Sequence, residues 1–392
     1  MTKIIKIAVD AMGGDNSPKK IIDGINHHYK SNSNTFYQIF GDREKIQKYT
    51  NNQLPTSSFE IIHTKDVVKG TDSPLEGAKR GKNTSMWLAI QSVKEKKSDI
   101  VISAGNTGAL LVISKLNLKM IENIDKPALS ALWPNKKNMS VVLDLGANIE
   151  CSPKNLIDFS IMGSSLFKSL YPDDTARVAL LNIGSEELKG NEIIKETYQQ
   201  LNQRNNTGFE FKGYIEGNQL MNGDVNVIVA DGFTGNVALK TAEGTANFIT
   251  SELKKAMTGS IIGKISSLLN ISNLKKFKAR LDPRLYNGAI FIGLDSPVIK
   301  SHGGTDYIGF SNSLSVCTLS LYTSDAADDL LCVDLGGRRI IKKKKKKKEK
   351  RNRIRIGIIT KNATHIYNIT YTTYDEHTHI YESSKHTQQN KK

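Results

Sequence analysis

The sequence predicts an α/β protein, because short apolar runs of β type alternate with longer segments of helical periodicity. Most of the apolar runs end in a loop that contains glycine, as strands followed by helices often do. Several runs are apolar throughout, which is typical of strands covered on both faces. The 392 residues are enough for one large or two medium domains with a sizeable core.

The individual elements follow from these patterns. The clearest apolar runs are predicted as strands, at residues 4–9, 36–40, 100–103, 141–144, 178–181, 227–230 and 289–292. Segments whose apolar residues recur with helical spacing are predicted as helices, at residues 19–29, 42–49, 86–96, 109–116, 153–170 and 191–201. Ser17 and Pro18 are predicted to cap the first helix and to open its first turn. No internal repeat and no linker is evident before residue 314.

The chain is basic, with a formal net charge of +16 from 55 Lys and Arg against 39 Asp and Glu. Such an excess indicates a partner rich in phosphate or carboxylate, such as nucleic acid, an anionic membrane or an acidic protein. The excess is uneven, because residues 315–392 hold 17 of the basic and 8 of the acidic residues. More than half of the net charge therefore belongs to the last fifth of the chain.

Cysteine usage and hydropathy indicate the cellular compartment of the protein. Cys151 is the one cysteine before residue 314, and Cys317 and Cys332 lie beyond it, so the sequence offers no disulfide framework and no CxxC metal spacing. This favours a reducing cytosol. No apolar stretch approaches the roughly 18 residues of a membrane span, and the first strand follows the N-terminus without a signal-peptide core. We expect a protein that is neither exported nor membrane-spanning.

Residues 254–281 form a basic amphipathic stretch. Its apolar residues fall on one helical stripe, at Met257, Ile261, Ile262, Ile265, Leu268 and Leu269. The charges nearby are Lys254, Lys255, Lys264, Lys275, Lys276, Lys278 and Arg280. The more ordinary interpretation is a helical hairpin that packs its apolar face on its own core. The alternative is a contact with a membrane surface.

The segment 315–392 loses both periodicities and is interpreted as a non-native C-terminal segment. Residues 342–348 are an unbroken lysine run. Such a run binds polyanions at low salt, but it is also what a poly-A tract encodes. Back-translated, residues 322–341 resemble a sequencing-library adapter. We therefore place the end of the natural reading frame near residue 315, so that residues 1–314 form the functional domain.

The first candidate site lies at the end of the first predicted strand, where two glycines stand between two acids: Asp10, Gly13, Gly14 and Asp15. A glycine pair permits a sharp turn and the close approach of a ligand to the backbone. Turns of this kind are common, so the motif alone is a weak sign of function.

The loop at residues 103–108 is a stronger candidate, because it follows an apolar strand and opens a helix. Its small residues leave backbone N–H groups of the helix N-terminus free to face an anion. The residues concerned are Ser103, Gly105, Asn106, Thr107 and Gly108. The loop has neither the Walker sequence nor the GxGxxG spacing of a dinucleotide site. It predicts a site for phosphate or an oxyanion, with a simple capped turn as the alternative.

A second loop of the same design contains Asp231, Gly232, Thr234, Gly235 and Asn236. The helix that it opens places Lys240 and then Glu243 on the face of Asn236. The lysine is positioned to neutralise a phosphate or a developing oxyanion, or else to form an ordinary exposed pair with Glu243.

The third element is the run at residues 298–304, where the period of a strand puts Lys300 and His302 on one face. His302 stands beside glycines at a strand end and is weighed as acid, base or oxyanion donor. The other early histidines, His27, His28 and His63, are predicted to be surface residues. Cys151 is predicted to be a small buried thiol, and no arrangement for covalent catalysis or metal binding is evident.

Seven motifs taken together resemble, in order and spacing, the phosphate acyltransferase family of bacterial phospholipid synthesis. They are IAVDAMGGD at 7–15, SAGNTGAL at 103–110, DLGANIEC at 144–151, NIGSEELKG at 182–190, YIEGN at 214–218, DGFTGNVALK at 231–240 and KSHG at 300–303. The likeness covers nearly all of residues 1–314.

This resemblance implies a three-layer α/β/α sandwich similar to isocitrate and isopropylmalate dehydrogenases and to phosphotransacetylases, assembled as a homodimer. It implies transfer of an acyl group from acyl carrier protein to inorganic phosphate, without a cofactor, for a downstream glycerol-3-phosphate acyltransferase. It also implies a cytoplasmic enzyme that works at the inner face of the cell membrane, with no nucleic-acid partner. On this basis we assign phosphate to the loops 103–108 and 231–236, and catalytic roles to Asn106, Lys240, Lys300 and His302.

Three other functions are the alternatives to acyl transfer from acyl carrier protein. A phosphotransacetylase that takes its acyl group from coenzyme A is the nearest. A dehydrogenase of the related fold needs a nicotinamide site and an acidic metal cluster, which the sequence does not offer. A non-enzymatic polyanion-binding protein would act through the lysine run at 342–348.

Overall fold

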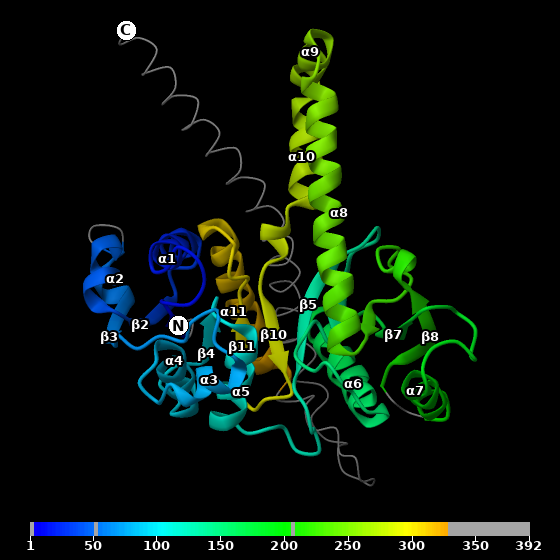
Figure 1. Ribbon diagram of the computed structural model, residues 1–392, viewed down its shortest axis with the longest axis horizontal. Helices are drawn as coiled ribbons and strands as arrows, with labels where there is room; N and C mark the ends of the chain where they lie inside the picture. The colour runs from blue at the N-terminus through cyan, green and yellow to red at the C-terminus, as the bar shows by residue number, and fades with distance from the viewer. Residues whose placement is uncertain (1–3, 51–53, 205–207, 328–392) are drawn as a thin grey trace, which may run out of the picture. The chain divides into compact units, whose positions relative to one another are not determined.

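A computed structural model of the chain describes residues 4–50, 54–204 and 208–327, with side chains to Leu321. In this part of the chain, eleven strands form one sheet in the order β3-β2-β1-β4-β11-β10-β5-β6-β9-β7-β8 (Figure 1). The strands are β1 (Ile5–Asp10), β2 (Thr35–Gly41), β3 (Phe59–His63), β4 (Ile100–Ser103), β5 (Ala128–Pro134), β6 (Met139–Leu143), β7 (Arg177–Asn182), β8 (Glu210–Glu216), β9 (Val227–Val229), β10 (Ala289–Ile292) and β11 (Val298–Lys300).

Helices connect most of these strands. They are α1 (Lys19–Ser31), α2 (Arg43–Thr50), α3 (Pro74–Lys79), α4 (Ser85–Lys94), α5 (Thr107–Asn117), α6 (Pro153–Leu170), α7 (Glu192–Asn202), α8 (Gly232–Thr258), α9 (Ile261–Leu269), α10 (Ile271–Leu281) and α11 (Tyr307–Ala327). Three short 3₁₀ turns lie at Thr56–Ser58, Gly217–Gln219 and Pro283–Tyr286.

The sheet consists of two parallel blocks that run in opposite directions. One block is β3-β2-β1-β4-β11 and the other is β6-β9-β7-β8. The strands β10 and β5 join them, and each pairs antiparallel with both of its neighbours. This arrangement makes a mixed sheet, and it places the ends of β1, β4 and β11 next to one another.

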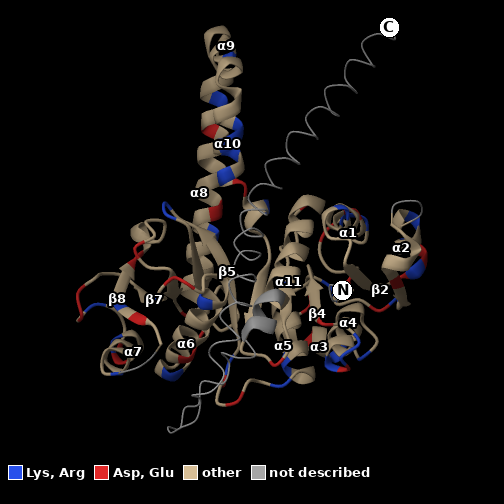
Figure 2. Cartoon of the chain, turned by 180° about the vertical axis from the view of Figure 1, so that it is seen from behind, with Lys and Arg blue, Asp and Glu red and all other residues tan. Residues whose placement is uncertain are grey.

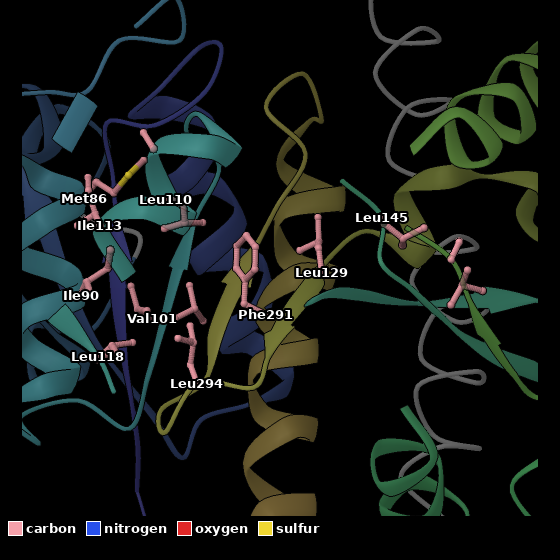
Figure 3. Packing of buried hydrophobic residues seen from close by; sticks show 14 of the residues in the cluster. Met86, Ile90, Val101, Leu110, Ile113, Leu118, Leu129, Leu145, Phe291 and Leu294 are labelled. Atoms are coloured by element: carbon pink, nitrogen blue, oxygen red, sulfur yellow. The ribbon is translucent and has the colours of Figure 1, made fainter. Parts of the chain in front are cut away.

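Alternation along the strands sends apolar side chains to both faces of the sheet. Val101 of β4 joins the cluster under α4 and α5, with Met86 and Leu110 (Figure 3). Its neighbours Ile100 and Ile102 join a second cluster with residues of α1 and α11. Around β6, β7 and β9 a third cluster packs against α6 and α7. Successive side chains of a strand point to opposite faces of the sheet, so each strand contributes apolar side chains to both faces. Helices cover both faces and bury these side chains.

The strand predictions are confirmed for all seven runs, with 100–103 and 289–292 correct to the residue. The strands β3, β5 and β8 were not predicted. Two of them, β3 and β8, are the edges of the sheet, where polar and half-exposed residues weaken the apolar signal. The six predicted helices are also present, within one or two residues at their ends.

Two local predictions were wrong. Ser17 does not cap α1, because its hydroxyl donates to the carbonyl of Gly13 at 2.6 Å instead. His28 is not a surface residue, since it is buried with Nδ1 at 2.7 Å from the hydroxyl of Tyr37. Burial lowers the pKa of His28 to about 3. Its hydrogen-bond partner Tyr37 comes from β2, so the pattern of α1 alone does not reveal the burial of His28.

The interpretation of residues 254–281 as a self-packed hairpin was wrong as well. The segment is helical, but Ile261, Ile262 and Leu269 are 78%, 78% and 86% exposed. Helices α9 and α10 pack against α8 and lie beside it in both views (Figures 1 and 2). Met257 belongs to α8, so the predicted stripe is divided between two helices. The apolar face of α9 therefore has no cover among the described residues.

Helix α11 continues past residue 314. Leu314 and Cys317 are fully buried in the cluster that α11 shares with α1. The boundary at 314 stays a prediction. Most of the segment 315–392, including the lysine run at 342–348, lies outside the described residues.

Candidate active site

Three glycine-bearing loops meet at the ends of the adjacent strands β1, β4 and β11. The amide of Asp15 donates to the carbonyl of Gly303 at 3.0 Å, and that of Ser301 donates to Ser103 at 2.9 Å. A Cβ atom on Gly13 would lie 2.6 Å from the amide nitrogen of Gly105, so only glycine permits this approach. The structure thus brings together the first, second and last of the predicted motifs.

The side chain of Asp10 holds two of these loops together. Its carboxylate is buried and accepts hydrogen bonds from the hydroxyls of Ser103 at 2.6 Å and Ser85 at 2.7 Å. Burial raises its pKa, and these hydrogen bonds oppose that rise. Asp10 and Ser103 were predicted to bind substrate, but their polar atoms are occupied in holding the loops. Ser85, at the start of α4, was not predicted.

Two buried lysines face the convergence of the loops. Lys300 is 9% exposed and its Nζ donates to the carbonyl of Ser301. Lys20, from the first turn of α1, is 6% exposed and donates to the carbonyl of Gly303. Burial lowers the pKa of both, to about 8 for Lys300. Lys20 was not predicted, because beside Lys19 at a helix start it looks like an ordinary surface lysine.

His302 and Lys240 lie next to each other beside the turn at residues 301–304. Nδ1 of His302 accepts a hydrogen bond from the amide of Gly304 at 3.1 Å, so the neutral ring carries its proton on Nε2. Nε2 is 3.5 Å from Nζ of Lys240, whose ammonium also pairs with Glu243 at 3.0 Å. Burial and the charge of Lys240 lower the pKa of His302. Two N–H donors therefore face each other, which is a geometry that an anionic oxygen between them would satisfy.

Asn106 is the N-cap of α5, and its side-chain amide already forms three hydrogen bonds within the protein. Oδ1 accepts from the amide of Ala109 at 3.0 Å, while Nδ2 donates to the carbonyls of Gly70 and Asp72. Its neighbours Thr107 and Gly108 form the first turn of the helix, with Gly108 against Pro74. These contacts hold the loop 103–108 against the segment before α3, which gives Asn106 a positioning role.

The second predicted anion loop, at residues 231–236, lies in the other half of the sheet. It follows β9, and four strands separate β9 from β4 in the sheet order. Asp231 caps α8 by accepting from the amide and hydroxyl of Thr234, both at 2.8 Å. The backbones of Gly232 and Gly235 pack on the loop at 144–148, where a Cβ on Gly235 would collide with the carbonyl of Asp144. Asn236 is exposed just beyond.

Within the described part of the chain, no hydrogen bond joins the loop at 231–236 to the loop at 103–108. The link between the two halves is Lys240, which lies two turns into α8 and reaches His302. The carboxylate of Asp144 organises the loop at 144–148 by accepting from the amides of Ala147 and Asn148. The sequence places Asp144 at the start of the motif at 144–151, but it does not predict this role.

The described part of the chain contains no group of three or more His, Cys, Asp or Glu side chains placed to hold a metal ion. Cys151 is buried, as predicted, and burial raises its pKa to about 11. Within residues 4–50, 54–204 and 208–327, none of the helices is long and apolar enough to cross a membrane.

Fold and site together define an α/β protein with a mixed sheet and a cationic, glycine-lined site at its strand ends. Solved structures with a similar fold include phosphotransacetylases from Streptococcus pyogenes and Staphylococcus aureus. Their TM-scores are 0.54 and 0.52 at 14% and 15% identity, over 82% and 81% of this chain and 94% of each of theirs.

The chain belongs to the fatty acid synthesis protein family, whose model matches residues 5–319. A phosphate acyltransferase of Pelagibacter ubique is 95% identical over 318 residues, which are 81% of this chain and 95% of that protein. Phosphate acyltransferases of Rhodospirillum rubrum and Maricaulis maris are 43% and 41% identical, over 81% of this chain and 90% and 91% of theirs. The resemblance predicted from the seven motifs is confirmed.

Proposed function

We propose that this protein transfers a fatty acyl group from acyl carrier protein to inorganic phosphate, giving an acyl phosphate and the free carrier protein. The observation that carries the proposal is the 95% identity, over 318 residues, to a phosphate acyltransferase. The convergence of Lys20, Lys300, Lys240 and His302 on one glycine-lined turn supports it, because a phosphate dianion needs such a set of donors.

The reaction makes defined demands on the site. A phosphate oxygen attacks the thioester carbonyl, the C–O bond forms, and the C–S bond breaks as the sulfur leaves and takes up a proton. The site must hold phosphate next to the acyl carbon and stabilise the tetrahedral oxyanion. We assign the oxyanion to Nε2 of His302 and Nζ of Lys240, since both donors face the same point.

The remaining predicted residues receive roles that follow from their contacts. The glycine-lined backbone at Gly13, Gly14 and Gly105 borders the phosphate, while the amide of Gly105 itself donates to Oγ of Ser103 at 3.0 Å. Asn106 positions α5, whose N-terminal dipole favours an anion. The exposed Asn236, one turn before Lys240 on α8, faces the acyl donor.

The acyl donor is tested by comparing the same acyl chain on acyl carrier protein and on coenzyme A. We expect acyl phosphate, trapped with hydroxylamine, to form only when phosphate is present and faster from the carrier protein by about tenfold or more. Lysozyme or another protein without acyltransferase activity serves as the blank. Equal or faster transfer from coenzyme A would favour a phosphotransacetylase-like enzyme instead.

We also propose a peripheral membrane contact and a homodimer. The exposed apolar residues of α9 lie among lysines of α8 and α10, which is a surface suited to an anionic bilayer and, by charge, to an acidic carrier protein (Figure 2). Phe248 and Ile249 of α8 are exposed too and offer an apolar face to a second copy. The acyl phosphate would pass to a glycerol-3-phosphate acyltransferase at the membrane.

A further inference from the structure

Lys20 is a buried cation that the fold does not neutralise. Its ammonium has three N–H donors, and one donates to the carbonyl of Gly303. Among the described residues no carboxylate lies within ion-pairing distance of its Nζ, although Asp15 is near enough to oppose the lowering of its pKa. A buried ammonium without a paired anion is costly.

A second cation of the same kind lies beside it. Lys300 approaches from β11, is equally buried, and uses its Nζ on the carbonyl of Ser301. The charge of Lys20 contributes to the lowered pKa of Lys300, so the two ammonium groups repel each other. The nearest buried acid, Asp10, already accepts from Ser85 and Ser103. Lys20 and Lys300 therefore each lie near a carboxylate, Asp15 and Asp10 respectively, but among the described residues neither ammonium forms an ion pair.

The backbone around Lys20 is shaped for a small ligand. Gly14 has a φ of +81°, and a Cβ there would lie 3.0 Å from Nζ of Lys20. Next to this turn is a cavity of about 440 Å³, open to solvent, whose walls include Asn16, Ser17, Lys20 and Thr305 together with two carboxylates, Asp23 and Asp306. Solutes can therefore reach Lys20 although its side chain is buried.

We propose that Lys20 binds inorganic phosphate together with Lys300, as a further substrate-binding residue of the reaction. The inference rests on the proposed function, and it names a residue of α1 that holds the nucleophile rather than the acyl group. Two ammonium groups at one turn match a dianion, whereas the thioester carbonyl is neutral before attack. Phosphate seated there satisfies the N–H donors that the fold leaves over.

Lys20→Gln is the informative variant, because it removes the charge and keeps a side chain with N–H donors. We expect its KM for phosphate to rise about tenfold or more while its KM for the acyl donor stays within about twofold. Lys20→Arg keeps the charge and should recover part of the loss. Lys19→Gln is the matched control, since Lys19 is 62% exposed in its side chain and pairs with Asp23 at 2.6 Å; its phosphate KM should not change.

Binding of inorganic phosphate alone, followed by calorimetry, gives a readout that does not depend on catalysis. Wild type and Lys19→Gln should bind phosphate, and Lys20→Gln should bind it about tenfold more weakly or worse. If Lys20→Gln has the phosphate KM and affinity of the wild type, the lysine only supports the Gly303 turn and the inference is wrong. If only the KM for the acyl donor rises, Lys20 serves the donor and the inference is equally wrong.

These outcomes are separate from a failure of the proposed function. A wild-type protein that forms no acyl phosphate contradicts the proposed function, while the calorimetric comparison still decides whether Lys20 binds phosphate. Thermal unfolding without phosphate shows whether each variant is folded, and Lys20→Met, which is also neutral and of similar length, replaces Lys20→Gln in both assays if the amide variant is not.

Discussion

At the scale of the residue, Lys300 shows how burial couples binding to pH. Its ammonium is removed from water and faces the charges of Lys20 on α1 and Lys240 on α8, while Asp10 on β1 attracts it. Burial is the largest of these causes, and together they lower the pKa of Lys300 to about 8. At neutral pH the side chain is therefore mostly charged, but it loses its proton a little above neutrality.

We expect the KM for phosphate to rise as the pH increases through about 8. The lowered pKa means that Lys300 gives up its proton in that range, so the site loses one of its two buried cations. Lys300→Arg should shift this rise out of the range measured, because the guanidinium stays protonated. The measurement is a pH series of phosphate KM for both proteins, and a flat profile for the wild type would contradict it.

The lowered pKa of Lys300 also makes the stability of the fold depend on pH. A group whose pKa is lowered on folding contributes stability that is present above its unfolded value, near 10.5, and is lost as pH falls through about 8. At neutral pH the charged Lys300 therefore weakens the fold that holds it. This is what a residue retained for binding rather than for packing would do.

Sequence patterns located some site residues and not others, for a physical reason. Gly13, Gly105, Lys300 and His302 stand at strand ends, so a local pattern is enough to mark them. Lys20 and Ser85 are recognisable only once β1, β4 and β11 are known to be neighbours, because the groups that they contact lie 283 and 75 residues away. No local period carries that information.

At the scale of the element, helix α9 presents the clearest unpartnered surface. Its apolar residues Ile261, Ile262 and Ile265 are exposed, and the lysines nearby are Lys264 of α9 and those of the adjoining helices. The sequence predicted the amphipathic pattern correctly, but it could not show which surface the apolar face would meet. That depends on α9 packing against the end of α8 instead of against the sheet.

The double variant Ile261→Asp, Ile265→Asp is expected to lose most of its binding to vesicles that contain anionic lipid. Two charges replace apolar area that would enter the lipid interface, and each buried aliphatic side chain is worth about 1.5–3 kcal/mol. Sedimentation with the vesicles measures the bound fraction. Acyl transfer in solution should be unchanged.

The matched control for this variant is Leu116→Asp, which places a charge at an exposed leucine on α5. It should sediment with vesicles as the wild type does. If the α9 variant binds vesicles as well as the wild type, its apolar face has another partner, and the assembly state of the two proteins becomes the next measurement.

At the scale of the whole molecule, the order of strands decides which predicted motifs meet. Two loops of the same design were expected to share one phosphate, since each follows an apolar strand and opens a helix. The sheet places them in blocks that run in opposite directions, with β11, β10, β5 and β6 between β4 and β9. Sequence can predict the number and type of such elements far better than their order in a sheet.

The last helix bears on where the functional chain ends. The family match ends at residue 319, and α11 continues to Ala327. Leu314 and Cys317 are both fully buried between α11 and the first strands, and Phe310 packs with them. A boundary at residue 314 would therefore cut through a packed helix.

We expect a chain that ends at Ala327 to keep the acyl transfer rate and melting temperature of the full chain, because the buried part of α11 is intact. A chain that ends at Leu314 should melt lower by about 5 °C or more, since it loses Cys317 and the remaining turns of the helix. Both chains lack the lysine run, so this difference isolates the helix from the charge. Loss of activity in the longer chain would mean that residues 328–392 belong to the enzyme, against their interpretation as a non-native segment.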